Sequence, residues 1–138
     1  MAQKNKSVLV IDDSTTARLN LVMMLNELKI SCDIVEAQDG VDALEKLESS
    51  PKFSLILLDV NMPRLDGMGF LEAARQTGAL KGSPVVMITA DDSRAMIMAA
   101  LQNGAADYLV KPVVKEELVD IFNKYFFVTV EAGTSLEF

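Results

Sequence analysis

A short run of large apolar residues, Leu55 to Leu58, stops abruptly at the acidic residue Asp59. Because the run is short, wholly apolar and flanked by turn-forming residues, it predicts a strand buried on both faces, as in parallel sheets covered by helices. Asp59 then lies at the carboxyl end of this strand, where open α/β sheets place their ligands. Pro63 and Gly67 follow and indicate an irregular loop before the next helix.

The rest of the chain alternates between strand-like and helix-like patterns. Short apolar runs predict five strands, at 7–11, 31–37, 54–59, 85–89 and 107–110. Apolar residues at helical spacing predict helices at about 17–28, 41–47, 68–76, 93–103 and 115–127. This alternation predicts an α/β fold with a five-stranded parallel sheet and helices on both faces, and the less apolar second strand suits the sheet edge. We expect one domain over residues 1–127, followed by an extended or frayed tail at 128–138.

Composition excludes several classes of function. The formal net charge of −7 argues against binding to a nucleic acid backbone, which needs clustered lysine and arginine. No apolar run approaches the roughly 20 residues that span a bilayer, and the first residues show no signal-peptide pattern. The single cysteine, Cys32, fits a reducing cytoplasm. Because the chain contains no histidine, its chemistry must use carboxylates, hydroxyls, lysine or a cation bound through oxygen.

Polar groups of complementary charge end four of the five predicted strands: Asp12 with Asp13, Asp59, Thr89 and Lys111. In a sheet with helices on both faces these ends share one edge, so the three carboxylates would repel one another unless a cation were bound. Oxygen-only ligands favour Mg²⁺ over zinc. A metal, an ammonium and a hydroxyl suit a dianionic phosphoryl group, and a carboxylate in that setting can act as the nucleophile. Taken singly, each residue also has a structural explanation: Asp13 as a helix cap, Thr89 as an ordinary strand end, and Lys111 as a solvated loop residue.

These residues, in this order, resemble the receiver domains of two-component response regulators, especially those of chemotaxis. The resemblance covers about residues 7–127 and implies a flavodoxin-like sheet with strand order 2-1-3-4-5. The motifs that carry it are Asp12-Asp13, the stretch from Asp59 to Gly67, Thr89-Ala90, Gly104-Ala105, Tyr108 and Lys111-Pro112.

The resemblance also implies how the acidic residues work. Asp59 is the expected phosphoacceptor, and Mg²⁺, or Mn²⁺ in its place, is the expected cofactor. Asp13 and Asp59 are expected to ligate the ion, with Asp12 acting through a bound water and Asn61 contributing its backbone carbonyl.

The remaining motif residues are implied to bind the phosphoryl group and to transmit the signal. Thr89 and Lys111 are expected to contact the phosphoryl oxygens, with the peptide bond between Lys111 and Pro112 in the cis form. Tyr108 is expected to turn inward when Thr89 moves. The output protein is then expected to bind the face formed by the fourth helix, the fifth strand and the fifth helix.

The expected function is that of a single-domain response regulator that is phosphorylated by a sensor histidine kinase or a phosphotransfer protein and signals in chemotaxis. We expect a cytoplasmic monomer that binds neither nucleic acid nor membrane and has no enzymatic activity beyond its own phosphorylation and dephosphorylation. A phosphorelay intermediate, a phosphate sink and a receiver fragment of a larger transcriptional regulator are open alternatives. Enzyme alternatives fit less well, because haloacid-dehalogenase-like phosphatases place Asp-x-Asp where this chain has Asp12-Asp13, and the P-loop signature of nucleotide hydrolases is absent.

Overall fold

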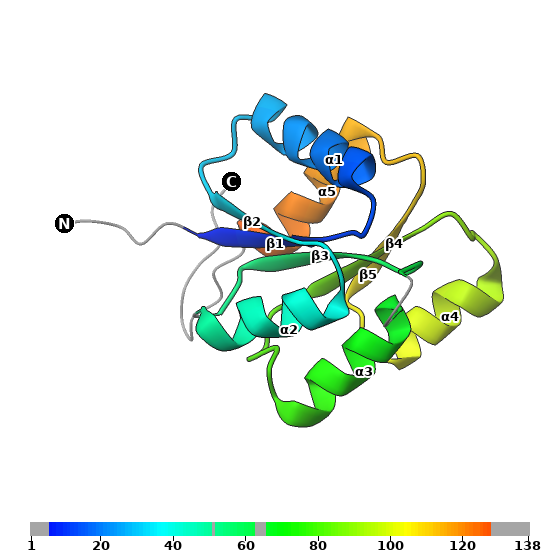
Figure 1. Cartoon of the computed structure of the whole chain (residues 1–138). Helices are drawn as coiled ribbons and strands as arrows, with labels where there is room; N and C mark the ends of the chain where they lie inside the picture. The colour runs from blue at the N-terminus through cyan, green and yellow to red at the C-terminus, as the bar shows by residue number, and fades with distance from the viewer. Residues whose placement is uncertain (1–5, 51, 63–65, 128–138) are drawn as a thin grey trace, which may run out of the picture.

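A five-stranded parallel sheet forms the centre of the molecule in the computed structural model, which describes residues 6–50, 52–62 and 66–127 (Figure 1). The strands lie in the order β2-β1-β3-β4-β5. Their bounds are β1 Ser7–Ile11, β2 Asp33–Ala37, β3 Leu55–Asp59, β4 Val85–Thr89 and β5 Asp107–Val110. The predicted fold class and strand order are confirmed, including the position of the less apolar second strand at the edge. That strand begins at Asp33, two residues later than predicted.

A helix follows each strand, and side-chain caps mark where four of the helices begin. The bounds are α1 Thr15–Glu27, α2 Gly40–Ser49, α3 Gly67–Thr77, α4 Arg94–Gln102 and α5 Lys115–Ile121. The capping side chains each accept a hydrogen bond from a backbone N–H in the first turn of α1, α2, α3 and α4, and they belong to Ser14, Asp39, Asp66 and Ser93. The predicted last helix is helical over 115–126, and its last turn, Phe122–Phe126, is π-helical (η1). This wider turn leaves the rings of Phe122 and Phe126 both buried.

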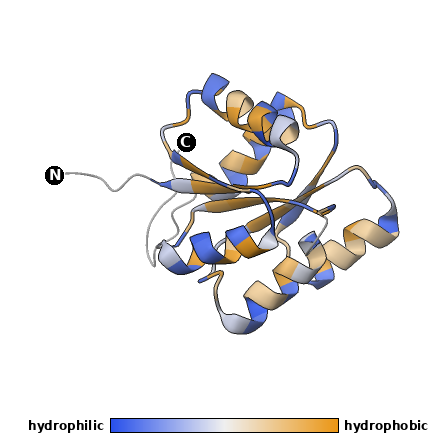
Figure 2. Cartoon of the chain, viewed as in Figure 1, coloured by the Kyte–Doolittle hydropathy of each residue, from blue (hydrophilic) through white to orange (hydrophobic). Residues whose placement is uncertain are grey.

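Two apolar cores separate the sheet from its helices. Figure 1 shows α1 and α5 on one face of the sheet and α2, α3 and α4 on the other. The first core packs helix residues Leu21, Leu25, Leu118, Ile121 and Phe122 against the strands. The second packs Ala43, Leu47, Phe70, Leu71 and Ala100 against the opposite face. Strands β3 and β4 are buried along their whole length, and the hydropathy colouring of Figure 2 shows largely apolar strands between layers of helices that carry both polar and apolar residues.

The parallel register brings the carboxyl ends of neighbouring strands to one edge. Ile11 pairs with Leu58, Asp59 with Ile88, and Thr89 with Val110. The residues that end β1, β3, β4 and β5 therefore lie side by side, as the sequence pattern predicts. Within the part of the chain that the structure describes, no helix is long and apolar enough to cross a membrane. The predictions about the tail at 128–138 and about Pro63 lie outside the described residues.

Candidate functional site

Three carboxylates meet at the carboxyl edge of the sheet. Asp12 and Asp13 follow β1, and Asp59 ends β3. Each of them offers an oxygen atom, and these oxygens all lie within 4.8 Å of one another. Asp12 and Asp59 are buried, at 5% and 3% exposure, whereas Asp13 is exposed and leaves the cluster open to solvent. The structure thus brings together the three acids that the sequence analysis selected.

Lys111 provides the positive charge at this edge. Its Nζ lies 3.0 Å from Oδ1 of Asp59, and the lysine side chain is 34% exposed while that of Asp59 is 3% exposed. The same Oδ1 atom is buried and accepts no hydrogen bond of ordinary geometry from the described residues. The contact is therefore a pairing of charges, and the oxygen keeps lone pairs for a further ligand.

Negative charge exceeds positive charge in the cluster. Burial raises the pKa of Asp12, and the neighbouring carboxylates of Asp59 and Asp13 raise it further, although a hydrogen bond from the Ser14 backbone N–H and the charge of Lys111 act in the opposite direction. A divalent cation bound by oxygen would relieve this repulsion. Three carboxylates, one of them with an unbonded buried oxygen, fit a hard cation such as Mg²⁺.

Thr89 and Lys111 are joined through their backbones. The N–H of Lys111 donates to the carbonyl oxygen of Thr89 at 2.8 Å. The Thr89 side chain is buried, and its hydroxyl oxygen accepts a hydrogen bond from the N–H of Asp91 at 3.0 Å. The peptide bond between Lys111 and Pro112 is cis, the geometry that the resemblance implies. The backbones that carry the hydroxyl and the ammonium are thus joined at one edge of the sheet.

Gly67 allows α3 to begin directly behind Asp59. A Cβ atom at Gly67 would lie 2.6 Å from the carbonyl oxygen of Asp59 and 2.7 Å from Cα of Val60, closer than real side chains approach. The N–H of Gly67 donates to the carbonyl of Val60 at 2.7 Å. Gly67 therefore starts the helix, whereas the sequence analysis assigned it to the preceding loop.

Arg18, a residue absent from the predicted site, holds the backbone carbonyl of Asp12 and pairs with Glu36. Arg18 on α1 donates from Nη1 to the carbonyl oxygen of Asp12 at 2.6 Å and from Nε to Oε1 of Glu36 on β2 at 2.9 Å. The N–H of Asp12 donates to the carbonyl of Ala37 at 3.1 Å. The sequence shows an arginine early in the helix that follows Asp12-Asp13, but it does not show that this arginine contacts the Asp12 carbonyl.

Two further expected residues lie on β5 and just after β3. Tyr108 is half-buried, pairs with Met87 in the sheet, and packs against the core on the α2–α3–α4 side. Asn61 is exposed and lies two residues beyond Asp59.

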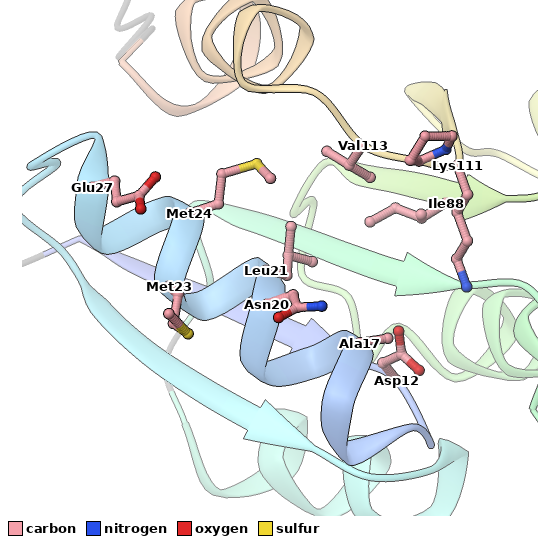
Figure 3. Close-up of a pocket in the computed structure, with 11 residues that line it drawn as sticks. Asp12, Ala17, Asn20, Leu21, Met23, Met24, Glu27, Ile88, Lys111 and Val113 are labelled. Carbon is pink, nitrogen blue, oxygen red and sulfur yellow. The ribbon is translucent and has the colours of Figure 1, made fainter.

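A groove of about 680 Å³ runs from the cluster along α1. Figure 3 shows Asp12 and Lys111 near one another, with Leu21, Met24 and Val113 lining the more apolar part. The groove leaves the acidic edge accessible from the side of α1.

Comparisons with known proteins agree with this geometry. The family model of the response regulator receiver domain matches residues 8–123. The chain is 36% identical to the chemotaxis protein CheY1 of Helicobacter pylori over 115 residues, covering 80% of this chain and 92% of that protein. The solved structure of the chemotaxis protein CheY4 of Vibrio cholerae has a TM-score of 0.78 and 30% identity, and the match covers 88% of this chain and 98% of that one.

A further similar structure contains a metal ion. The receiver domain of a sensor histidine kinase from Pseudomonas aeruginosa PAO1, with a magnesium ion coordinated in its active site cleft, has a TM-score of 0.78 and 25% identity, and covers 89% of this chain and 98% of that one. Strand order, acidic edge and family model all agree, and the chain therefore belongs to the response regulator receiver domains of two-component signalling.

Proposed function

We propose that Asp59 accepts a phosphoryl group from a phosphohistidine of a sensor histidine kinase or a phosphotransfer protein, and that its phosphorylation carries a chemotaxis signal. The observation that supports this most directly is the 3.0 Å pair between Lys111 and the buried carboxylate of Asp59. Asp12 and Asp13 add two carboxylates whose oxygens lie within 4.8 Å of that of Asp59. A buried acid placed between a cation and two further acids suits a nucleophile, because structural stability alone does not favour that arrangement.

Asp12, Asp13 and Asp59 are the proposed binding site for Mg²⁺, which Mn²⁺ can replace. The backbone carbonyl of Asn61 is the proposed further protein ligand. The magnesium ion in the cleft of the similar receiver domain supports the choice of metal. When bound, the ion neutralises negative charge on the carboxylates and on the phosphoryl oxygens.

The protein's own groups then have distinct parts in the transfer. An oxygen of Asp59 attacks the phosphorus atom, a P–O bond forms, the P–N bond breaks, and the electron pair leaves with the histidine nitrogen. Lys111 pairs with negative charge on the phosphoryl oxygens. Because the hydroxyl oxygen of Thr89 accepts from Asp91, the hydroxyl proton is free to be donated to a phosphoryl oxygen. The chain is its own substrate in this scheme and has no further enzymatic activity.

The signal is proposed to leave through Thr89 and Tyr108. Movement of the Thr89 hydroxyl towards the phosphoryl group opens space in which Tyr108 turns inward. This changes the face formed by α4, β5 and α5, where Met98 and Leu101 of α4 are 47% and 43% exposed and offer apolar contacts. Coupling of ordinary size makes the output partner bind roughly five- to 150-fold more tightly to the phosphorylated protein.

The test is incubation with acetyl phosphate and Mg²⁺, followed by intact-mass measurement. We expect one phosphoryl group on wild type, none without a divalent cation, and none on Asp59→Asn. Asp107→Asn is the matched control, because it removes an acid from the opposite edge of the sheet and should be phosphorylated like wild type. Equal phosphorylation of Asp59→Asn and wild type would overturn the proposal.

The chemotaxis assignment is supported by the chemotaxis relatives, and a cytoplasmic monomer is the proposed acting form. A strain in which Asp59 is replaced by asparagine should swim but fail to follow an attractant gradient. Normal chemotaxis with altered gene expression would instead favour a phosphorelay intermediate or a part of a larger transcriptional regulator.

A further inference from the structure

Arg18 connects three parts of the molecule at the acidic edge. Its side chain is only 14% exposed, although arginine on a surface helix usually reaches into solvent. Nη1 donates to the backbone carbonyl of Asp12 at 2.6 Å, and Nε donates to the carboxylate of Glu36 at 2.9 Å. The planar guanidinium therefore spans from α1 to the end of β1 and to β2 in one fixed orientation.

The bond to the Asp12 carbonyl fixes a particular peptide plane. That carbonyl belongs to the peptide group between Asp12 and Asp13, so its direction sets the orientation from which the Asp13 side chain departs. The preceding peptide is held by the bond from the Asp12 N–H to Ala37, and the Asp12 carboxylate is held by the N–H of Ser14. The side chain of Asp13 is exposed, so the backbone is the main determinant of where its carboxylate lies.

We propose that Arg18 is a positioning residue of the metal site: by holding the Asp12 carbonyl, it keeps the carboxylate of Asp13 within reach of those of Asp12 and Asp59. Glu36 orients the guanidinium for this task and balances its charge. The inference rests on the proposed function, since it assigns Arg18 a part in the binding of Mg²⁺ by these acids. Outer groups that orient metal ligands typically change metal affinity about 10- to 100-fold when removed.

If Arg18 acted only through its charge, its removal would change the Mg²⁺ affinity in the opposite direction. A positive charge beside three carboxylates repels a divalent cation, so its removal should tighten Mg²⁺ binding if charge were its main contribution. Loss of positioning should weaken Mg²⁺ binding. The sign of the change in affinity therefore separates the two explanations.

The experiment is calorimetric titration of Mg²⁺ into metal-free wild type and variants. The double variant Arg18→Met, Glu36→Gln is the main test, because it removes the bridge and leaves the summed charge of the pair unchanged. We expect it to bind Mg²⁺ about tenfold more weakly. Arg18→Met alone should also bind more weakly despite its more negative site. Arg18→Lys keeps the charge but lacks the planar fork, and should fall between wild type and Arg18→Met.

Lys81→Met is the matched control. The ammonium of Lys81 also holds backbone carbonyls, those of Leu47 at 3.0 Å and Ser50 at 2.7 Å, but at the end of α2 and away from the acids. Its loss should lower the melting temperature and leave the Mg²⁺ affinity unchanged. A merely structural role for Arg18 would give the same result as this control.

The outcomes separate this inference from the proposed function. If the double variant, folded by circular dichroism, binds Mg²⁺ as tightly as wild type, or if Arg18→Met binds it more tightly, the positioning role is wrong while the metal site stands. If wild type binds no Mg²⁺, or if Asp13→Asn binds it like wild type, the metal site itself is wrong and the role of Arg18 fails with it. The NMR chemical shift of the Asp13 amide gives a second readout that does not depend on the ion. In metal-free protein we expect this resonance to shift in Arg18→Lys and to stay unshifted in Lys81→Met.

Discussion

Two aspartates at opposite edges of the sheet have opposite surroundings. Asp107 begins β5, and its carboxylate accepts a hydrogen bond from the Tyr125 hydroxyl at 2.9 Å and has the ammonium of Lys124 at 3.5 Å. Asp59 ends β3 and has Lys111 at 3.0 Å, with the carboxylates of its two acidic neighbours within 4.8 Å. The side chain of Asp107 is 21% exposed and that of Asp59 is 3% exposed.

The more deeply buried acid is thus the one with more negative charge around it and fewer hydrogen bonds. Burial makes an uncompensated charge costly, so selection for stability alone would give Asp59 the better partners. Asp107 therefore has a structural role, whereas the surroundings of Asp59 suit a ligand that is not part of the chain. Functional sites commonly lower the stability of the free protein in this way.

The largest expected effect is stabilisation of the folded protein by Mg²⁺. It should depend on Asp12, Asp13 and Asp59 and not on Asp107. An ion that binds the folded state raises the free energy of unfolding by about 2.7 kcal/mol at 100 times its Kd. We expect this increment in wild type and in Asp107→Asn, and little of it in Asp13→Asn. Urea denaturation in EDTA and in excess Mg²⁺ measures it for each protein. If Mg²⁺ raised the free energy of unfolding of Asp13→Asn as much as that of wild type, the ion would have to bind elsewhere.

A smaller stabilising effect is expected from Asp12→Asn in metal-free protein. The replacement removes a buried charge from among its acidic neighbours, and the amide oxygen can still accept from the N–H of Ser14. We expect it to raise the free energy of unfolding at neutral pH by roughly 1 kcal/mol. The matching replacement of Asp107 should lower it, because it weakens the bonds to Tyr125 and Lys124.

The stabilisation by Asp12→Asn should depend on pH, because the pKa of Asp12 is raised in the folded protein. A raised pKa means that the folded state favours the protonated carboxyl, so this stabilising contribution is present below the ordinary pKa and is lost as the pH rises through the raised value. Acidification should therefore bring wild type closer to Asp12→Asn in stability. Urea denaturation in EDTA at several pH values measures the gap, and a gap that widens on acidification would contradict this account.

The acidic edge was predictable from the sequence for a physical reason. The buried run at 55–58 requires a parallel sheet, and parallel strands end at one edge, so Asp12, Asp13 and Asp59 had to lie near one another. Lys111 and Thr89 follow from the same rule, because each stands at the end of a strand.

Side-chain bridges were not predictable in the same way. The contact of Arg18 with the Asp12 carbonyl depends on the path of one long side chain back across the start of α1, and no periodicity encodes it. The π-helical turn at Phe122–Phe126 has the same apolar residues that a regular helix would bury. Within this turn the Tyr125 hydroxyl donates to the carboxylate of Asp107 on β5, a contact between elements that helical periodicity does not predict.

The smallest expected effect concerns Tyr125→Phe, which removes the hydroxyl that donates to Asp107. Burial, the hydrogen bond to Asp107 and the charge of Asp107 together raise the pKa of Tyr125 to about 12. The folded state thus favours the neutral phenol, so its stabilising contribution is complete below the ordinary pKa of 10.0 and is lost as the pH rises through about 12. At neutral pH the replacement should cost about 0.5 kcal/mol, because the bond lies at a half-exposed site. Urea denaturation between neutral pH and pH values approaching 12 should show wild type converging on Tyr125→Phe, and a constant difference would mean that Asp107 is not held through this proton.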